Sequence, residues 1–257
     1  MVTTCFRRSS DYWIGRTPSA SIVVPIHWST LQRPLQGSLR TRSYLSGPRG
    51  CCRPRRVAGR ALTSQIPLGG GLGGGSSDAA TTLLALNALW GLGLGLQVLR
   101  KLALRLGADV PFFLSGGNAF AEGIGEKLTP LDLPDAWYVV LMPPVAVPTR
   151  EVFASPELTA DSKIVKISRF SRGFGVNALE PIVRHLHPVV AAHLDWLSQH
   201  GPAKMSGSGA CVFAEFDTEA QAASVLARRP DGMEGFVAKG LARHPIVGLL
   251  ERARQDG

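Results

Sequence analysis

The sequence predicts a two-domain α+β fold, and three observations carry this prediction. The chain has 257 residues, of which 45% are apolar, and this is ample for a buried core. From residue 65 onward, segments with helical spacing alternate with short apolar runs that are typical of strands. Pro143 and Pro144 form a natural hinge between two such groups. We therefore expect an Arg-rich segment over residues 1–64, one domain over 65–145 and a second over 146–257.

The first 64 residues differ from the rest of the chain in charge. They contain eleven Arg, no Lys and one acid, Asp11, whereas Lys plus Arg nearly balance Asp plus Glu in residues 65–257. The net charge of +9 therefore arises mostly in this first segment. Its apolar residues show no sustained period, so we expect irregular structure there. The balanced remainder has no basic stripe with interleaved aromatics, and nucleic acid is not an expected partner.

Cysteine usage and hydropathy limit the setting of the protein. Three of the four cysteines lie in the first segment, and their spacing matches neither a disulfide framework nor a zinc site. No apolar run reaches the length that a membrane-spanning helix needs. We expect a cytoplasmic protein, monomer or homodimer, with a small-molecule substrate, no membrane partner and no protein-bound metal centre.

A glycine-rich loop opens the folded part. Six of the seven residues from Gly69 to Gly75 are glycine, and a helical pattern follows at once. We expect Ser76 or Ser77 to cap this helix and a second helix, over residues 96–106, to close at Gly107.

Such a loop is typical of phosphate binding. Glycine leaves no Cβ between the backbone N–H groups and an anion, and a helix N-terminus adds unsatisfied donors and partial positive charge. The loop is not a Walker A motif, because Gly75 is followed by Ser76 rather than Lys. The acid that a dinucleotide-binding fold needs about 20 residues further on is missing. A flexible linker is the structural alternative.

The later elements alternate regularly. Asp109 lies in a loop that enters a short apolar segment, and residues 118–131 are predicted to form a hairpin. A buried strand is expected over Trp137–Met142, and helices over 177–199. A strand leading to Gly207, a strand at 211–216, a helix near 218–228 and a strand at 235–239 complete the prediction.

Several motifs in order resemble the GHMP kinase superfamily. The stretch 67–80 resembles its ATP loop, and residues 107–113, 119–126 and 206–213 resemble three further stretches of the branch that phosphorylates 4-diphosphocytidyl-2-C-methyl-D-erythritol. The resemblance covers roughly residues 65–245. It implies a ribosomal-protein-S5-like N-terminal domain, here incomplete, and a ferredoxin-like C-terminal domain.

The resemblance also implies a function and a site. The function is ATP-dependent phosphorylation of the 2-hydroxyl of that cytidine diphosphate methylerythritol in non-mevalonate isoprenoid synthesis, with Mg²⁺ on the nucleotide. Asp109 is the implied catalytic base, and Thr149 and Phe153 match the cytidine pocket. The implied nucleotide-binding residues are Pro67, Leu68, Gly69, Gly70, Gly71, Leu72, Gly73, Gly74, Gly75, Ser76, Ser77, Ser206, Gly207, Ser208 and Gly209.

Two expected features of the family do not match. The family has a Lys in its first strand and an early Tyr-His pair, whereas residues 1–100 contain no Lys and His27 is followed by Trp28. A transit peptide does not explain this, since the unusual sequence runs directly into the ATP loop. A shifted reading frame upstream of Gln65 is our hypothesis.

Three alternatives therefore remain open. They are another GHMP small-molecule kinase, a non-enzymatic basic protein that binds nucleic acid through its Arg-rich start, and a catalytically inactive remnant.

Overall fold

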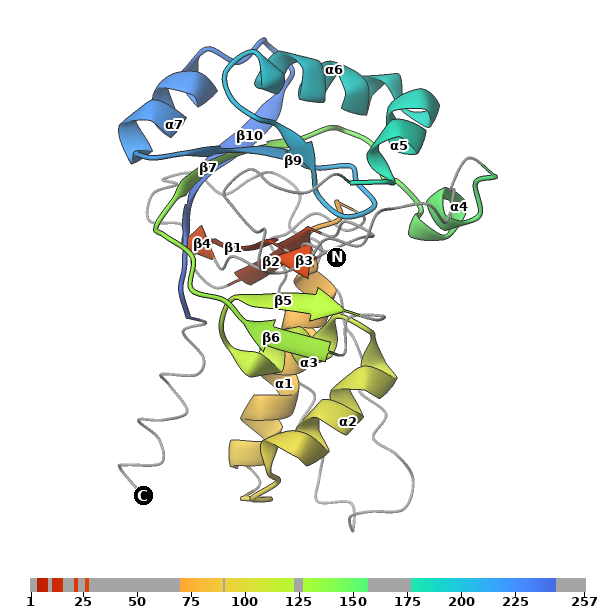
Figure 1. Cartoon of the computed structure of the whole chain (residues 1–257), viewed down its shortest axis with the longest axis vertical. Helices are drawn as coiled ribbons and strands as arrows, with labels where there is room; N and C mark the ends of the chain where they lie inside the picture. Colours follow the sequence, from red (N-terminus) through yellow and green to blue (C-terminus); the bar gives the residue numbers. More distant parts are fainter. Residues whose placement is uncertain are drawn as a thin grey trace.

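The molecule has helices on its two outer sides and strands between them (Figure 1). The computed structural model describes residues 70–89, 91–122, 127–156 and 177–243, together with the backbone of four strands within residues 4–27. Helices α5, α6 and α7 cover one face of the largest sheet, and α1, α2 and α3 lie at the opposite end of the molecule (Figure 1).

The helices are α1 (Gly74–Leu89), α2 (Leu96–Leu106), α3 (Val110–Ser115), α4 (Thr149–Phe153), α5 (Glu180–Leu186), α6 (Pro188–Ser198) and α7 (Glu219–Ala227). The strands are β1 (Thr4–Arg8), β2 (Asp11–Gly15), β3 (Ser21–Ile22), β4 (Ile26–His27), β5 (Ala119–Glu122), β6 (Lys127–Pro130), β7 (Trp137–Met142), β8 (Lys204–Met205), β9 (Val212–Phe216) and β10 (Glu234–Gly240).

The largest sheet has the strand order β4-β10-β7-β9-β8, and its neighbouring strands are antiparallel. Its strand β7 is buried on both faces, because successive side chains of a strand point to opposite sides. Val139 and Leu141 pack into the core beneath α5, α6 and α7, whereas Tyr138 and Val140 pack into a second core on the other face. The continuous apolar run 137–142 correctly predicted this buried strand.

A third core holds the helices at the other end together. Leu99 and Ala103 of α2 and Phe113 of α3 pack with Ala80 of α1. The predicted hairpin is confirmed, since β5 and β6 pair in antiparallel register. This core fixes the direction of α1, whose first turn begins at the glycine-rich loop.

The start of the chain differs from the expected irregular segment. Strands β1 and β2 pair with each other, β3 pairs with β5, and β4 pairs with β10. The physical reason is that a strand can form by hydrogen bonding to an edge supplied elsewhere in the chain, which needs no apolar period of its own. Residues 28–69 lie outside the described residues.

The two predicted domains share this sheet arrangement at one strand. Strand β7, which precedes the expected boundary at residue 145, lies between β9 and β10 of the later segment. The division at 145 stays a prediction.

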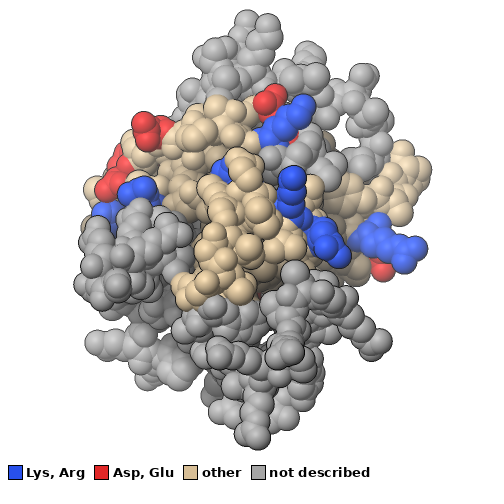
Figure 2. All heavy atoms as spheres, turned by 90° about the horizontal axis from the view of Figure 1, so that it is seen from below, with Lys and Arg blue, Asp and Glu red and all other residues tan. Residues whose placement is uncertain are grey.

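The described surface carries mixed charge. Viewed from below (Figure 2), the described Lys and Arg side chains lie at separate places around an uncharged centre, with Asp and Glu side chains nearby. Within the same described ranges, no helix combines the length and the apolarity needed to cross a membrane.

Candidate nucleotide-binding site

The first loop turns sharply into α1. Gly71 and Gly73 have φ values of +72° and +65°, which favour glycine. The helix begins at Gly74, and the first helical bond joins the Ser77 N–H to the Gly73 carbonyl at 2.9 Å. The N–H groups of the residues between them precede that bond and have no acceptor one turn back in the helix. These donors and the helix dipole make this end of α1 suited to an anion.

The predicted cap was wrong by about one turn. Ser76 and Ser77 lie inside the first turn of α1 rather than before it, and Ser77 is buried. The reason is that the two glycines with positive φ reverse the chain early, so that Gly73 takes the capping position. Pro67, Leu68 and Gly69 of the predicted loop lie outside the described residues.

The glycines of this loop have different surroundings. A Cβ added at Gly75 would meet no heavy atom within 4 Å, so the first turn of α1 faces open space there. A Cβ added at Gly71 would overlap the Ser206 carbonyl and lie 2.8 Å from the Gly209 carbonyl oxygen. Gly71 is therefore required for a close approach of two backbones, whereas Gly75 leaves room for a ligand.

The second loop, Ser206–Gly209, packs directly on the first. The Ser206 hydroxyl donates to the Gly71 carbonyl at 2.9 Å, and the Cys211 N–H donates to the Gly70 carbonyl at 3.1 Å. Residues that are 135 positions apart in the sequence are thereby joined. The structure thus brings together the two glycine motifs that the sequence singled out separately.

Cys211 supports this contact from below. Its thiol is buried, and burial raises its pKa far above the ordinary value. A Cβ at Gly70 would lie 2.9 Å from the Cys211 sulfur. Because the thiol stays protonated, Cys211 packs against the loop and is no nucleophile.

Asn177 and Glu180, which our sequence reasoning did not select, hold the second loop from the other side. The Asn177 side chain donates to the carbonyls of Met205 and Gly207 at 3.1 and 2.8 Å. The Glu180 carboxylate accepts from the Met205 N–H at 3.0 Å. A buried polar residue just before a helix was the only available signal, and many such residues are simple caps.

Thr149 and Phe153 lie on the short helix α4 beside this loop. The hydroxyls of Thr149 and Ser208 are 2.8 Å apart and hydrogen bonded. Phe153 at the end of α4 is 47% exposed, while Val152 anchors the helix in the core. The structure therefore joins one residue of the predicted cytidine pocket to the phosphate loop and leaves the aromatic ring accessible.

Asp109 is half-buried in the capping position of α3. We expected a loop that enters an apolar segment, and the structure has a short helix because Pro111 suits its first turn. The Asp109 side chain does not cap this helix. Helix α3 packs against α1, so Asp109 is carried by an element that touches the helix of the first loop.

A partly buried charge cluster lies beneath the second loop. Burial raises the pKa of Glu180, which the hydrogen bond from the Met205 N–H partly offsets. Burial likewise lowers the pKa of Lys204, which the carboxylates of Glu215 and Glu180 partly offset. Opposite charges thus face each other next to Met205, where the loop begins.

Known sequences with this pattern are kinases. The GHMP kinases N terminal domain matches residues 51–117, and the GHMP kinases C terminal domain matches residues 162–234. A 4-diphosphocytidyl-2-C-methyl-D-erythritol kinase of Thiobacillus denitrificans is 59% identical over 198 residues, which are 77% of this chain and 71% of that protein. The Nitrosomonas eutropha enzyme of the same name is 58% identical, over 72% of this chain and 68% of that protein.

Solved structures agree with this fold. A crystal structure of a 4-(cytidine 5'-diphospho)-2C-methyl-D-erythritol kinase matches with a TM-score of 0.62 and 28% identity, over 93% of this chain and 94% of that one. The Methanococcus jannaschii mevalonate kinase shares the fold alone, with a TM-score of 0.53 and 16% identity over 69% of this chain and 67% of that one. The chain therefore belongs to the GHMP kinases, within the family of the 4-diphosphocytidyl-2-C-methyl-D-erythritol kinases.

Proposed function

We propose that this protein transfers the γ-phosphoryl group of ATP to the 2-hydroxyl of 4-diphosphocytidyl-2-C-methyl-D-erythritol, in isoprenoid precursor synthesis. The observation that carries the proposal is the contact between the two glycine loops, Gly70–Gly75 and Ser206–Gly209, at the start of α1. Relatives of that name at 58–59% identity support the choice of substrate.

The loops would bind the triphosphate and leave the chemistry to one carboxylate. In this proposal the substrate oxygen attacks the γ-phosphorus, the bond from that phosphorus to the β-γ bridging oxygen breaks, and ADP leaves. Asp109 takes the proton of the attacking hydroxyl. Backbone N–H groups at the start of α1 stabilise the charge on the phosphates, which is the main task in phosphoryl transfer.

Mg²⁺ fits this site as a partner of the nucleotide. The described residues hold no group of three or more His, Cys, Asp or Glu side chains suited to a metal, and Mg²⁺ in kinases relies on phosphate oxygens and water with one or two carboxylates. When bound, the ion would neutralise charge on the β- and γ-phosphates.

Thr149 and Phe153 would receive the cytidine. Phe153 offers an exposed ring for stacking on the base, which is worth about 1–3 kcal/mol. The hydrogen bond between Thr149 and Ser208 links this side of the site to the phosphate loop. The proposal includes a cytoplasmic setting and a monomer or homodimer.

A second candidate is a relative that binds ATP without transferring phosphate. The absence of Lys from residues 1–100 favours it, since the family orients the attacking hydroxyl with a Lys in its first strand.

An assay of the full chain separates these candidates. Purified protein is incubated with ATP, Mg²⁺ and the cytidine diphosphate substrate, and ADP and phosphorylated product are measured, with ATP affinity by calorimetry. Stoichiometric formation of both products supports the kinase. ATP binding without product supports the inactive relative, and turnover with mevalonate, homoserine or galactose instead would point to another GHMP kinase. A chain that binds no ATP overturns both candidates.

A further inference from the structure

Asn177 satisfies all its hydrogen-bonding groups while it is almost completely buried. Only 3% of the residue is exposed. Its Nδ2 atom donates to the carbonyl oxygens of Met205 and Gly207, and its Oδ1 atom accepts from the Leu179 N–H at 3.0 Å. A buried amide with three good bonds specifies one local geometry, because any other leaves a polar group unpaired.

The carrier of Asn177 is rigid. It directly precedes α5, whose Ile182 and Val183 are buried beside the large sheet. Glu180 of the same helix accepts from the Met205 N–H. The segment 177–180 therefore binds Met205 at both its N–H and its carbonyl.

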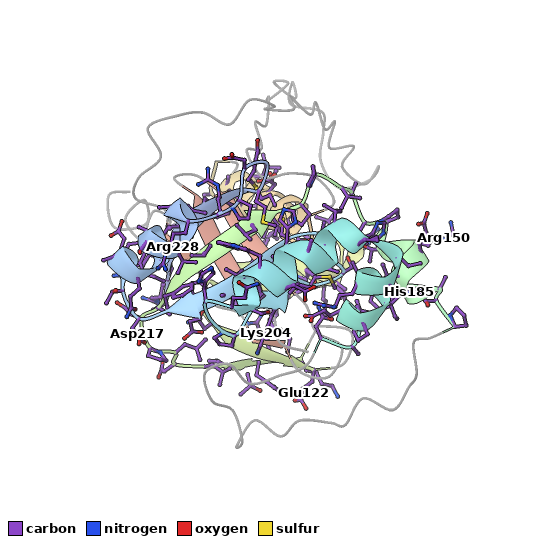
Figure 3. All side chains as sticks on the ribbon, turned by 90° about the horizontal axis from the view of Figure 1, so that it is seen from above. Glu122, Arg150, His185, Lys204, Asp217 and Arg228 are labelled. Carbon is purple, nitrogen blue, oxygen red and sulfur yellow. The ribbon has the colours of Figure 1, made fainter. Side chains whose placement is uncertain are left out.

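Viewed from above (Figure 3), Lys204, which directly precedes Met205, lies toward the middle of the molecule, and Arg150 of α4 lies at its rim. The second loop therefore begins in the interior and runs toward the helix that carries the predicted cytidine pocket.

The bond to Gly207 determines the direction of a peptide group. In a trans peptide unit the carbonyl and the following N–H point in opposite directions. Since Asn177 holds the Gly207 carbonyl at 2.8 Å, the Ser208 N–H must point away from Asn177. Gly207, with a φ of +57°, allows this orientation of the chain.

We propose that Asn177 is a positioning residue for phosphoryl transfer: it fixes the Gly207–Ser208 peptide so that the Ser208 N–H faces the phosphates of ATP. This inference rests on the proposed function, because it assigns the ligand of that N–H. Asn177 itself touches neither ATP nor substrate, and it acts through the loop.

Two variants test the proposal. Asn177→Asp keeps an oxygen for the Leu179 N–H but replaces the donor to Met205 and Gly207 with an acceptor. Asn177→Ala removes all three bonds. We expect both to raise the Kd for ATP about tenfold or more, because a freed peptide no longer presents its N–H. The affinity for adenosine, which lacks phosphates, should stay unchanged in the folded protein.

Asn87 provides a matched control. It is also a buried asparagine, and its side chain makes two bonds to the backbone of Leu94, at the far end of α1. Asn87→Ala should lower the melting temperature as Asn177→Ala does, yet leave the ratio of ATP to adenosine affinity unchanged.

The ratio of the two affinities decides between the outcomes. If wild type binds ATP and Asn177→Asp keeps the wild-type ratio, Asn177 has only a structural role and the inference is wrong. If wild type itself binds ATP no better than adenosine, the proposed function fails first. A selective loss of ATP affinity in both Asn177 variants, with Asn87→Ala unaffected, supports the inference.

Discussion

The two glycine loops of this protein reach their shapes by different means. Gly70–Gly75 continues into a helix, and its residue Gly75 is exposed with open space around it. Ser206–Gly209 is buried and is held by side chains from elsewhere, namely Asn177 and Thr149, and by the Glu180 bond at its base. The first loop offers donors to a ligand, whereas the second is fixed by its neighbours.

This difference predicts how each loop fails. Changes in the first loop should act on nucleotide affinity, because its amides have room to meet an anion. Changes at the second loop, or at the seam between the two, should act on stability as well, because buried hydrogen bonds hold it. Four substitutions test this comparison.

The largest effect is expected at Asp109, which lies in neither loop. Asp109→Asn removes the proposed base and should lower kcat by about 10²–10⁴-fold. The Kd for ATP should stay within the error of the wild-type value, because both loops keep their geometry. Steady-state kinetics together with calorimetry measure the two quantities. A kcat close to that of wild type would show that the base lies elsewhere.

Gly71→Ala breaks the seam between the loops. The new Cβ would overlap the Ser206 carbonyl, and the residue would have to keep a φ of +72°. Strain of the left-handed backbone and overpacking together should lower the free energy of unfolding by about 2–5 kcal/mol. Urea denaturation measures this loss.

Gly95→Ala is the control for this experiment. Gly95 caps α2 with a φ of −67°, and its Cβ would meet nothing within 4 Å. We expect a change in unfolding free energy below about 1 kcal/mol. Equal losses at Gly71 and Gly95 would contradict the tight contact of the two loops.

Gly75→Ala separates ligand space from protein packing. Gly75 lies in the first turn of α1, so alanine there should stabilise the fold by about 0.5–1 kcal/mol. The methyl group would nonetheless project into the open space assigned to the phosphates, and we expect the affinity for ATP to fall about tenfold. Thermal unfolding without ligand and ATP calorimetry provide the two readouts. Unchanged ATP affinity would place the phosphates elsewhere.

The smallest effect is expected from Glu180→Gln, which keeps an acceptor for the Met205 N–H and removes a charge. Burial raises the pKa of Glu180 from 4.5, so the folded state holds this proton more tightly than the unfolded state. The group therefore makes the wild type less stable as pH rises from about 4.5 through the folded pKa. Glu180→Gln lacks this loss.

The difference in unfolding free energy between Glu180→Gln and wild type should hence grow in favour of the variant across that window and then stay constant. Denaturation curves at several pH values measure it. A difference that runs in the opposite direction would mean that the attraction of Lys204 outweighs the burial of the carboxylate.

Much of the fold was predictable because local patterns carried it. The apolar run at 137–142, the helical spacing at 96–106 and the alternation after residue 200 all matched observed elements. The cap of α1 was misplaced, because two glycines with positive φ decided where the helix begins. The strands within residues 4–27 were also missed, because they form on edges supplied by distant residues.

The sequence by itself determined the two glycine motifs, the buried strand β7 and the resemblance to a kinase family, because these depend on local backbone freedom and periodicity. Only the tertiary structure decided that Ser206 meets Gly71, that Ser208 bonds to Thr149 and that Asn177 holds the Gly207 carbonyl. Each of these contacts joins residues that are far apart in the chain, and their hydrogen bonds form only once the sheet and α5 have brought the backbones together.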